Sequence, residues 1–206
     1  MRDFGTGWKL AALSVLFLTG LIQYDYQERR DNVMSENKIN SDCVTAFRKL
    51  AAGNFKDWPG LSSQCKPADL AAVFSGGETS ANGMLSNRPT QFRAYQTPEQ
   101  PEIIQAWFDD NDNVLLITNV SPVIQGDVKT LLESFGPPEK RLEQGTGYHA
   151  DAHQWVYAGR GITFYVREHS NEIARVAVYP PTSVEDYINR LGAKDQKRYW
   201  PTNQRR

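Results

Sequence analysis

Residues 162–180 read "ITFYVREHSNEIARVAVYP", and residues 104–122 read "IQAWFDDNDNVLLITNVSP". Each stretch begins with Ile, ends with Pro and has a polar cluster at its centre. Apolar residues alternate with other residues on both sides of the cluster, which is typical of two half-buried strands joined by a turn. The two stretches therefore predict two β-hairpins of similar design within one chain.

A short helical pattern and a third strand pattern precede each hairpin. The helices are expected in "KPADLAAVFSGG" (66–77) and "GDVKTLLESFGPP" (126–138), where Leu70 and Phe74 correspond to Leu131 and Phe135 at helical spacing. Strands are expected near 90–96, 102–109 and 113–120, and again near 153–158, 162–167 and 173–179. The predicted fold class is α+β, a tandem repeat of a short helix plus a three-stranded antiparallel meander. Two unrelated meanders, alike only because hairpins resemble one another, are the alternative.

Two further helices complete the expected organisation, one in "NSDCVTAFRKLAAGN" (40–54) and one in "TSVEDYINRLG" (182–192). Each has a polar capping residue before its apolar positions and a glycine after them. The predicted parts are a signal anchor or transmembrane helix at 1–26, a linker at 27–40, a first module at 41–122, a second module at 123–192 and a basic tail at 193–206.

The N-terminal part contains "LAALSVLFLTGLI" from Leu10 to Ile22, with aromatic residues on both sides of it. Aromatic residues favour membrane interfaces, and the segment reaches membrane-spanning length only if these flanks are included. An uncleaved anchor is the favoured interpretation; a cleaved signal peptide and a buried soluble helix are the alternatives. The anchor predicts a single-pass inner-membrane protein whose domain lies in the periplasm or another extracytoplasmic space.

The chain has two cysteines, Cys43 and Cys65. Outside the cytoplasm they are expected to form a disulfide, whereas two unrelated buried thiols are the alternative. Neither cysteine belongs to a C-x-x-C motif, so a redox or zinc role has no support. The formal net charge of −1 gives no electrostatic reason to expect a nucleic-acid partner.

Strand alternation selects candidate binding residues on the side of the sheet away from the helices. Trp107 and Tyr165 occupy the same position in the two hairpins, Arg167 follows on the same face, and Trp155 lies on the strand before. Exposed aromatic and arginine side chains are frequent anchors of protein interfaces. In the competing interpretation, Trp107 and Tyr165 are covered by the linker, by the final helix or by the other module.

The candidates for catalysis are weaker. His149, Asp151 and His153 alternate as they would on one side of a strand and could hold a metal, although a polar loop that runs into the strand with Trp155 is the favoured interpretation. The cluster "DDNDN" (109–113) has a composition that suits calcium, but it lacks the glycine and distal glutamate of an EF-hand and is interpreted as a hairpin turn. No nucleophile or phosphate-binding motif is present, and no cofactor is expected.

The helix and Gly-Pro sequence in "LLESFGPP" (131–138), followed by a meander, resembles the small module of the outer-membrane assembly lipoproteins. A tandem pair of such modules, from Lys66 to Pro181, also resembles the secreted β-lactamase inhibitor protein family. The chain lacks the lipidated cysteine of the first family, because Leu21 stands at its place in "LTGL". Both families bind proteins without catalysis, which is what the resemblance implies here.

The predicted function is a non-catalytic, membrane-tethered accessory subunit or inhibitor that binds a protein partner of a membrane or envelope complex. Two alternatives remain open at this point. One is a metal-assisted hydrolase that uses His149, Asp151 and His153. The other is an immunity-type inhibitor of a secreted toxin, for which the sequence offers no specific motif.

Overall fold

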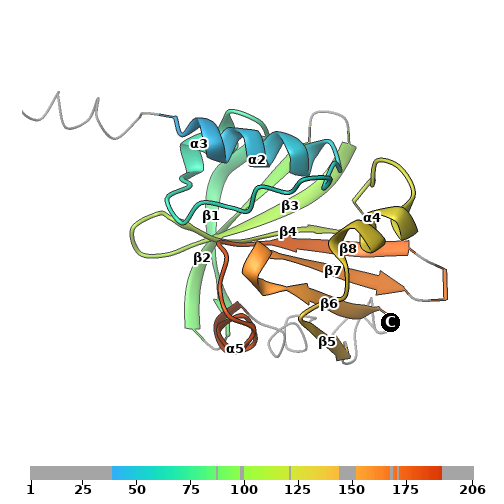
Figure 1. Cartoon of the computed structure of the whole chain (residues 1–206). Helices are drawn as coiled ribbons and strands as arrows, with labels where there is room; N and C mark the ends of the chain where they lie inside the picture. The colour runs from blue at the N-terminus through green and yellow to red at the C-terminus, as the bar shows by residue number, and fades with distance from the viewer. Residues whose placement is uncertain are drawn as a thin grey trace, which may run out of the picture. The chain divides into compact units, whose positions relative to one another are not determined.

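The computed structural model describes residues 39–191, except residues 87, 98–99, 121, 144–151, 168 and 171. All eight strands of this region belong to one antiparallel sheet (Figure 1). They are β1 (Ser75–Leu85), β2 (Arg88–Thr97), β3 (Gln100–Phe108), β4 (Val114–Val120), β5 (Lys140–Glu143), β6 (His153–Tyr157), β7 (Ile162–Arg167) and β8 (Glu172–Val178). Their order across the sheet is β1-β2-β3-β4-β8-β7-β6-β5.

The prediction of tandem modules with three-stranded meanders is wrong. One continuous sheet contains four strands from each half of the described chain, and β4 pairs with β8 where the halves meet. The sequence pattern does not predict the two edge strands: β1 reads "SGGETSANGML", with glycines and small polar residues, and β5 has only four residues. Neither segment shows the apolar alternation on which the prediction depends.

The predicted N-terminal helix (1–26) and nearly all of the predicted linker lie outside the described residues, as does the predicted basic tail (193–206). Among the residues that the structure describes, no helix is long and apolar enough to cross a membrane.

One face of the sheet, here called the inner face, is covered by helices α2 (Ser41–Ala51), α3 (Pro67–Ala71) and α4 (Val128–Phe135). Paired residues of successive strands form a row across this face: Tyr95, Ile104, Asn119, Val176, Phe164 and Trp155. Phe55, from the loop after α2, and Phe135, from α4, both meet the Phe164 ring edge-on, with centroids 5.6 and 5.1 Å away. The larger hydrophobic core therefore lies between this row and the helices.

The first turn of α2 is held from two sides. The Asn40 side chain caps the helix by accepting hydrogen bonds from the backbone N–H groups of Asp42 and Cys43. The buried Asp69 carboxylate accepts hydrogen bonds from the backbone N–H groups of Asn40, at 2.7 Å, and Lys66, at 2.8 Å. One carboxylate thus joins the start of α2 to the start of α3.

The predicted disulfide is confirmed: Cys43 and Cys65 are bonded, and both are fully buried. The bond connects the first turn of α2 to the loop before α3. The Cys65 carbonyl in turn accepts a hydrogen bond of 2.8 Å from the Val114 N–H at the start of β4. Helix α2 is therefore linked through Cys65 to the centre of the sheet.

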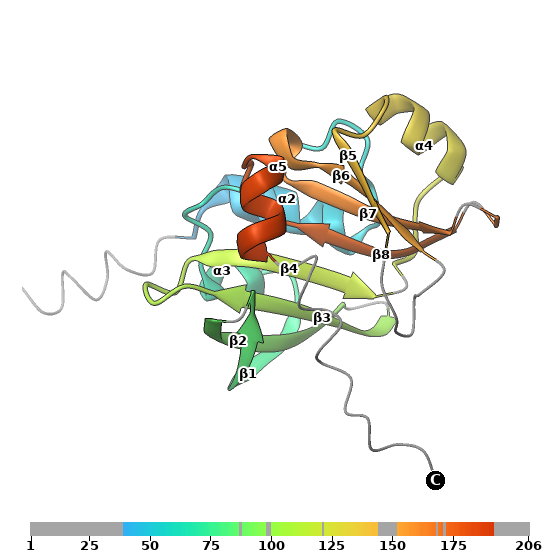
Figure 2. The same ribbon diagram turned by 90° about the horizontal axis from the view of Figure 1, so that it is seen from below.

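The opposite face, here called the outer face, carries the last described helical segment, α5 (Val184–Asp186) and η2 (Tyr187–Leu191). Figure 2 shows this segment on the side of the sheet away from α2. Ser183 caps its start by accepting a hydrogen bond from the Asp186 N–H. Tyr187 is buried and stacks on Tyr179, with ring centroids 4.9 Å apart, so the outer face has a hydrophobic core of its own.

Candidate functional site

The four residues predicted to bind a partner do not form one surface. Trp107 and Tyr165 lie on the outer face as their alternation indicates, but only 9% and 0% of their surfaces are exposed. Trp155 is paired with Phe164 and lies on the inner face, where the Arg141 guanidinium stacks over its ring at 4.3 Å. Arg167, at the end of β7, forms an ion pair of 2.9 Å with Glu172.

Tyr165 is buried because the outer face is covered by the C-terminal helical segment. Its hydroxyl lies 3.5 Å from that of Tyr187, and the Tyr187 hydroxyl donates a hydrogen bond of 2.9 Å to Oε1 of Gln154. Beside this pair, the Thr163 and Tyr179 hydroxyls are 2.8 Å apart. These polar atoms are satisfied within the fold, as buried polar groups require.

Two members of the buried tyrosine cluster, which is formed by Tyr165, Tyr179 and Tyr187, have raised pKa values. Burial raises the pKa of Tyr179 far above its usual value, against a smaller lowering effect of the Thr163 hydrogen bond. Burial also raises the pKa of Tyr187, and the neighbouring Tyr165 and Tyr179 add to the shift. Tyr179 and Tyr187 therefore stay protonated at neutral pH and hold the helical segment on the sheet through packing and hydrogen bonds.

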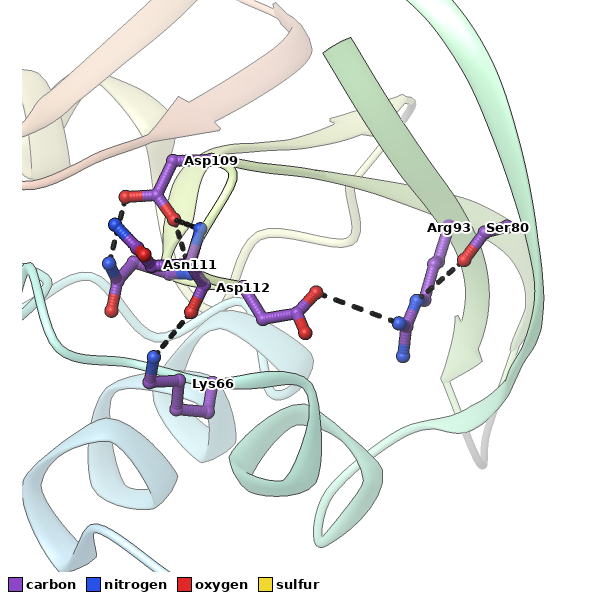
Figure 3. A network of polar contacts seen from close by, with 7 residues as sticks. Lys66, Ser80, Arg93, Asp109, Asn111 and Asp112 are labelled. Carbon is purple, nitrogen blue, oxygen red and sulfur yellow. Dashed lines mark hydrogen bonds and ion pairs between the residues drawn. The ribbon is translucent and has the colours of Figure 1, made fainter. Parts of the chain in front are cut away.

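The β3–β4 turn is a densely hydrogen-bonded polar group. Oδ1 of Asp109 accepts hydrogen bonds of 2.8 Å from the backbone N–H groups of Asn111 and Asn113, and Oδ2 accepts one of 2.8 Å from the Asn113 side chain (Figure 3). Asp112 then takes a positive φ of 59°, a conformation that aspartate tolerates better than most residues. The hairpin-turn interpretation of "DDNDN" is confirmed.

This arrangement keeps Asp109 ionised. Burial raises the pKa of its carboxyl, but the hydrogen bonds from Asn113 and Asn111, together with the positive charge of Lys66, lower it further, and the net pKa is below its usual value. The three donors to the carboxylate are N–H groups, which suit an ionised acceptor. Asp109 is therefore a structural acceptor of the turn.

Two cations tie this turn to its neighbours. Nζ of Lys66 donates a hydrogen bond of 2.6 Å to the Asn111 carbonyl. Arg93, on β2, lies 3.8 Å from the Asp112 carboxylate and donates through Nε to the Ser80 hydroxyl on β1, at 3.0 Å (Figure 3). The turn, β2 and β1 are thereby connected on the inner side of the sheet.

A shallow cleft of about 230 Å³ lies beside the turn. It is lined by the turn, by the loop after β8 and by the end of the C-terminal helical segment, with Asp186 and Arg190 on its rim. Both rim residues are exposed. None of the described residues that line this cleft has a buried, unsatisfied polar side-chain atom.

The predicted metal ligands are only partly described. His153 lies on β6, on the half-buried inner side, whereas His149 and Asp151 lie outside the described residues. Within the described residues, no three His, Cys, Asp or Glu side chains gather closely enough to hold a metal ion. The hydrolase hypothesis therefore gains no geometric support from the described part of the chain.

No family model matches the chain, and no curated protein matches its sequence. Among solved structures, the chain is similar to the crystal structure of a DUF4309 family protein, YjgB, from Bacillus subtilis. The two sequences are 14% identical, the match covers 68% of this chain and 99% of that chain, and the TM-score is 0.41. At this level of similarity, the neighbouring structure assigns neither a family nor a function to the chain.

Proposed function

We propose that the chain is a non-catalytic binding protein that works outside the cytoplasm and is held at a membrane by its N-terminal segment. The observation that carries this proposal is the Cys43–Cys65 disulfide, because such bonds persist in oxidising compartments and are rare in the cytosol. The apolar sequence from Leu10 to Ile22, which precedes Cys43 in the chain, supplies the means of export or attachment.

Binding is favoured over catalysis by the way in which the domain uses its polar side chains. Asp69 holds two helix starts, Asp109 holds a turn, and the buried tyrosines bond to one another and to neighbouring strands. Each of these groups makes its hydrogen bonds within the fold. Catalytic residues, in contrast, converge on an open cleft where a substrate can bind. The expected partner is a protein of a membrane or envelope complex.

The proposal is tested on the full chain expressed in its own host. We expect it to fractionate with membranes, to be digested by a protease added from outside the cytoplasm and to begin at residue 1 or 2 by mass spectrometry. A mature N-terminus between residues 20 and 27 would show that the N-terminal segment is a cleaved signal peptide and not an anchor. Protection from external protease together with two free thiols would refute the extracytoplasmic location.

A second measurement addresses the lack of catalysis. Metal analysis of the purified chain should find no stoichiometric transition metal, whereas one bound zinc per chain would favour the hydrolase with His149, Asp151 and His153. The variant His153→Gln is the matched control, because it removes the one predicted ligand that the structure describes. Stoichiometric metal that is lost in this variant would contradict the proposed function.

A further inference from the structure

The two edges of the sheet differ in their protection against pairing with another strand. β5, at one edge, is short, and three of its four residues are charged. β1, at the other edge, has eleven residues, of which Glu78 is the only charged one. Short edge strands and charged side chains usually prevent an edge strand from pairing with a strand of another chain. β5 has both features, whereas β1 is long and has a single charged residue.

The accessible part of β1 is its second half. A bulge between Gly76 and Ser80 interrupts its pairing with β2, and Gly76 and Gly77 have positive φ angles of 87° and 80°. From Ser80 to Leu85 the strand pairs with β2 without interruption. Within the part of the chain that the structure describes, no strand follows β1 at its outer edge, as Figure 2 shows. This six-residue stretch is about 20 Å long.

The outer-face side of the stretch is apolar. It carries Ala81, Gly83 and Leu85, and the Trp107 ring reaches across to Gly83, where a Cβ atom would lie 2.8 Å from Cη2 of the indole. Phe92 packs on the same ring, with centroids 4.9 Å apart. Arg88, which pairs with Leu85, brings a charge to the end of this side, whereas Ala81 and Gly83 pair with the uncharged Phe92 and Thr90. A strand added here would be stabilised by apolar side chains on this side.

The inner-face side is different. It carries Ser80, Asn82 and Met84, and Met84 is 41% exposed. The Ser80 hydroxyl already accepts a hydrogen bond from Arg93, whose charge lies beside Asp112. Polar, uncharged side chains suit this side, because they can hydrogen-bond to Asn82 without disturbing the neighbouring ion pair.

We propose that Ser80–Leu85 accepts an extended segment of a partner protein as a ninth antiparallel strand. The segment is uncharged and alternates, with apolar side chains on the outer-face side and small polar side chains on the inner-face side. Its backbone supplies the affinity, and the alternation supplies the specificity. This inference rests on the proposed function, for which it names the surface and the kind of partner.

A second copy of the chain fits the same edge less well. In a symmetric pair of β1 strands, the side chains available to the outer face are those of Ala81, Gly83 and Leu85 themselves. Two of these three are too small to cover the Trp107 ring.

The test uses the full chain and an acetylated, amidated eight-residue peptide of alternating Val and Ser. We expect saturable binding below about 1 mM, and about tenfold slower hydrogen exchange at alternate backbone amides from Ser80 to Leu85. Methylation of every second peptide nitrogen on one edge should abolish binding, and methylation on the other edge should not. Absence of binding, or slowed exchange outside β1, overturns the proposal. Slow hydrogen exchange at alternate β1 amides in the chain without peptide, if it disappears on dilution, also overturns the proposal. The strand paired with β1 would then belong to a second copy of the chain.

A matched pair of variants tests the required chemistry. Ala81 and Ala68 are both exposed alanines, the first on β1 and the second on α3. Ala81→Lys should weaken the Val/Ser peptide about threefold or more and strengthen a Glu/Ser peptide, whereas Ala68→Lys should change neither. Equal effects of both variants overturn the proposed site. The proposed function fails separately, through the location and thiol state of the chain in its host, so the two outcomes are distinguishable.

Discussion

Phe164 and Tyr165 are adjacent residues of β7, and both are fully buried on opposite faces of the same sheet. Phe164 packs under α4 and the loop after α2, whereas Tyr165 belongs to the core under the C-terminal helical segment. A strand buried on both faces loses the usual distinction between a core side and a solvent side. The sheet of this domain is therefore a central layer with a hydrophobic core on each side.

Truncation of either residue should destabilise the domain strongly. We expect Phe164→Ala and Tyr165→Ala each to lower the free energy of unfolding by about 3–5 kcal/mol in urea titrations, because each leaves a large buried cavity. Val123→Ala, at a position that is 57% exposed, is the control and should change it by less than about 0.5 kcal/mol. A mild effect of Tyr165→Ala would mean that the outer face is open in solution.

The disulfide should contribute through the unfolded state. Cys43 and Cys65 are 22 residues apart in the sequence. For a loop of this length, Cys65→Ser should lower the free energy of unfolding by about 3 kcal/mol. The measurement is a urea titration under oxidising conditions, with the wild-type chain in reductant as the control. Two titratable thiols in the native, unreduced chain would show that the bond does not form.

Asp69 should be important for stability because it joins the starts of α2 and α3. Asp69→Asn replaces one of two acceptor oxygens by a donor and leaves the N–H of Asn40 or Lys66 unsatisfied in a buried place. The expected loss is about 1–3 kcal/mol of unfolding free energy. Asp110→Asn, at an exposed position of the β3–β4 turn, serves as the matched control and should have little effect.

The β3–β4 turn should make the domain sensitive to acid. The folded pKa of Asp109 is lower than its unfolded value of about 3.9, so its stabilising contribution is present above that pH and is lost as pH falls through the folded pKa. Asp109→Asn should therefore be less stable than wild type at neutral pH and should lose less stability on acidification. Parallel slopes of unfolding free energy against pH for the two proteins would contradict this assignment.

The tyrosine cluster should make the domain sensitive to alkali. The folded pKa values of Tyr179 and Tyr187 lie above the unfolded value of about 10, so the stability that these groups provide is complete below that pH and declines above it. Absorbance at 295 nm should show exposed tyrosines titrating first and the buried ones ionising only as circular dichroism reports unfolding. Tyr179→Phe should reduce the number of tyrosines in this late phase by one.

The sequence predicts the central hairpins well because their alternation reflects real burial. The strands expected near 113–120 and 162–167 are found at Val114–Val120 and Ile162–Arg167. The edge strand β1 is missed because its side chains are mostly exposed and carry no periodic signal. Its pairing with β2 comes from backbone hydrogen bonds, which any sequence without proline can supply.

The candidate surface shows a different limit. The alternation correctly places Trp107 and Tyr165 on the face opposite Phe108 and Phe164, but alternation does not report what covers a face. Tyr165 is covered by Tyr187, 22 residues further along the chain, and this tyrosine gives a weak signal among polar neighbours. Contacts at such separation depend on how the whole sheet is assembled.

The disulfide and the Asp69 carboxylate also determine how the domain would carry mechanical load. A pull on the chain ahead of Asn40 acts on a backbone N–H that is bonded to Asp69, and three residues later it meets the covalent bond to Cys65. From Cys65 the force passes through a backbone hydrogen bond to Val114 and into β4, at the middle of the sheet. Because the disulfide bypasses α2, we expect tension on the N-terminal segment to reach α3 and β4 without first unwinding that helix.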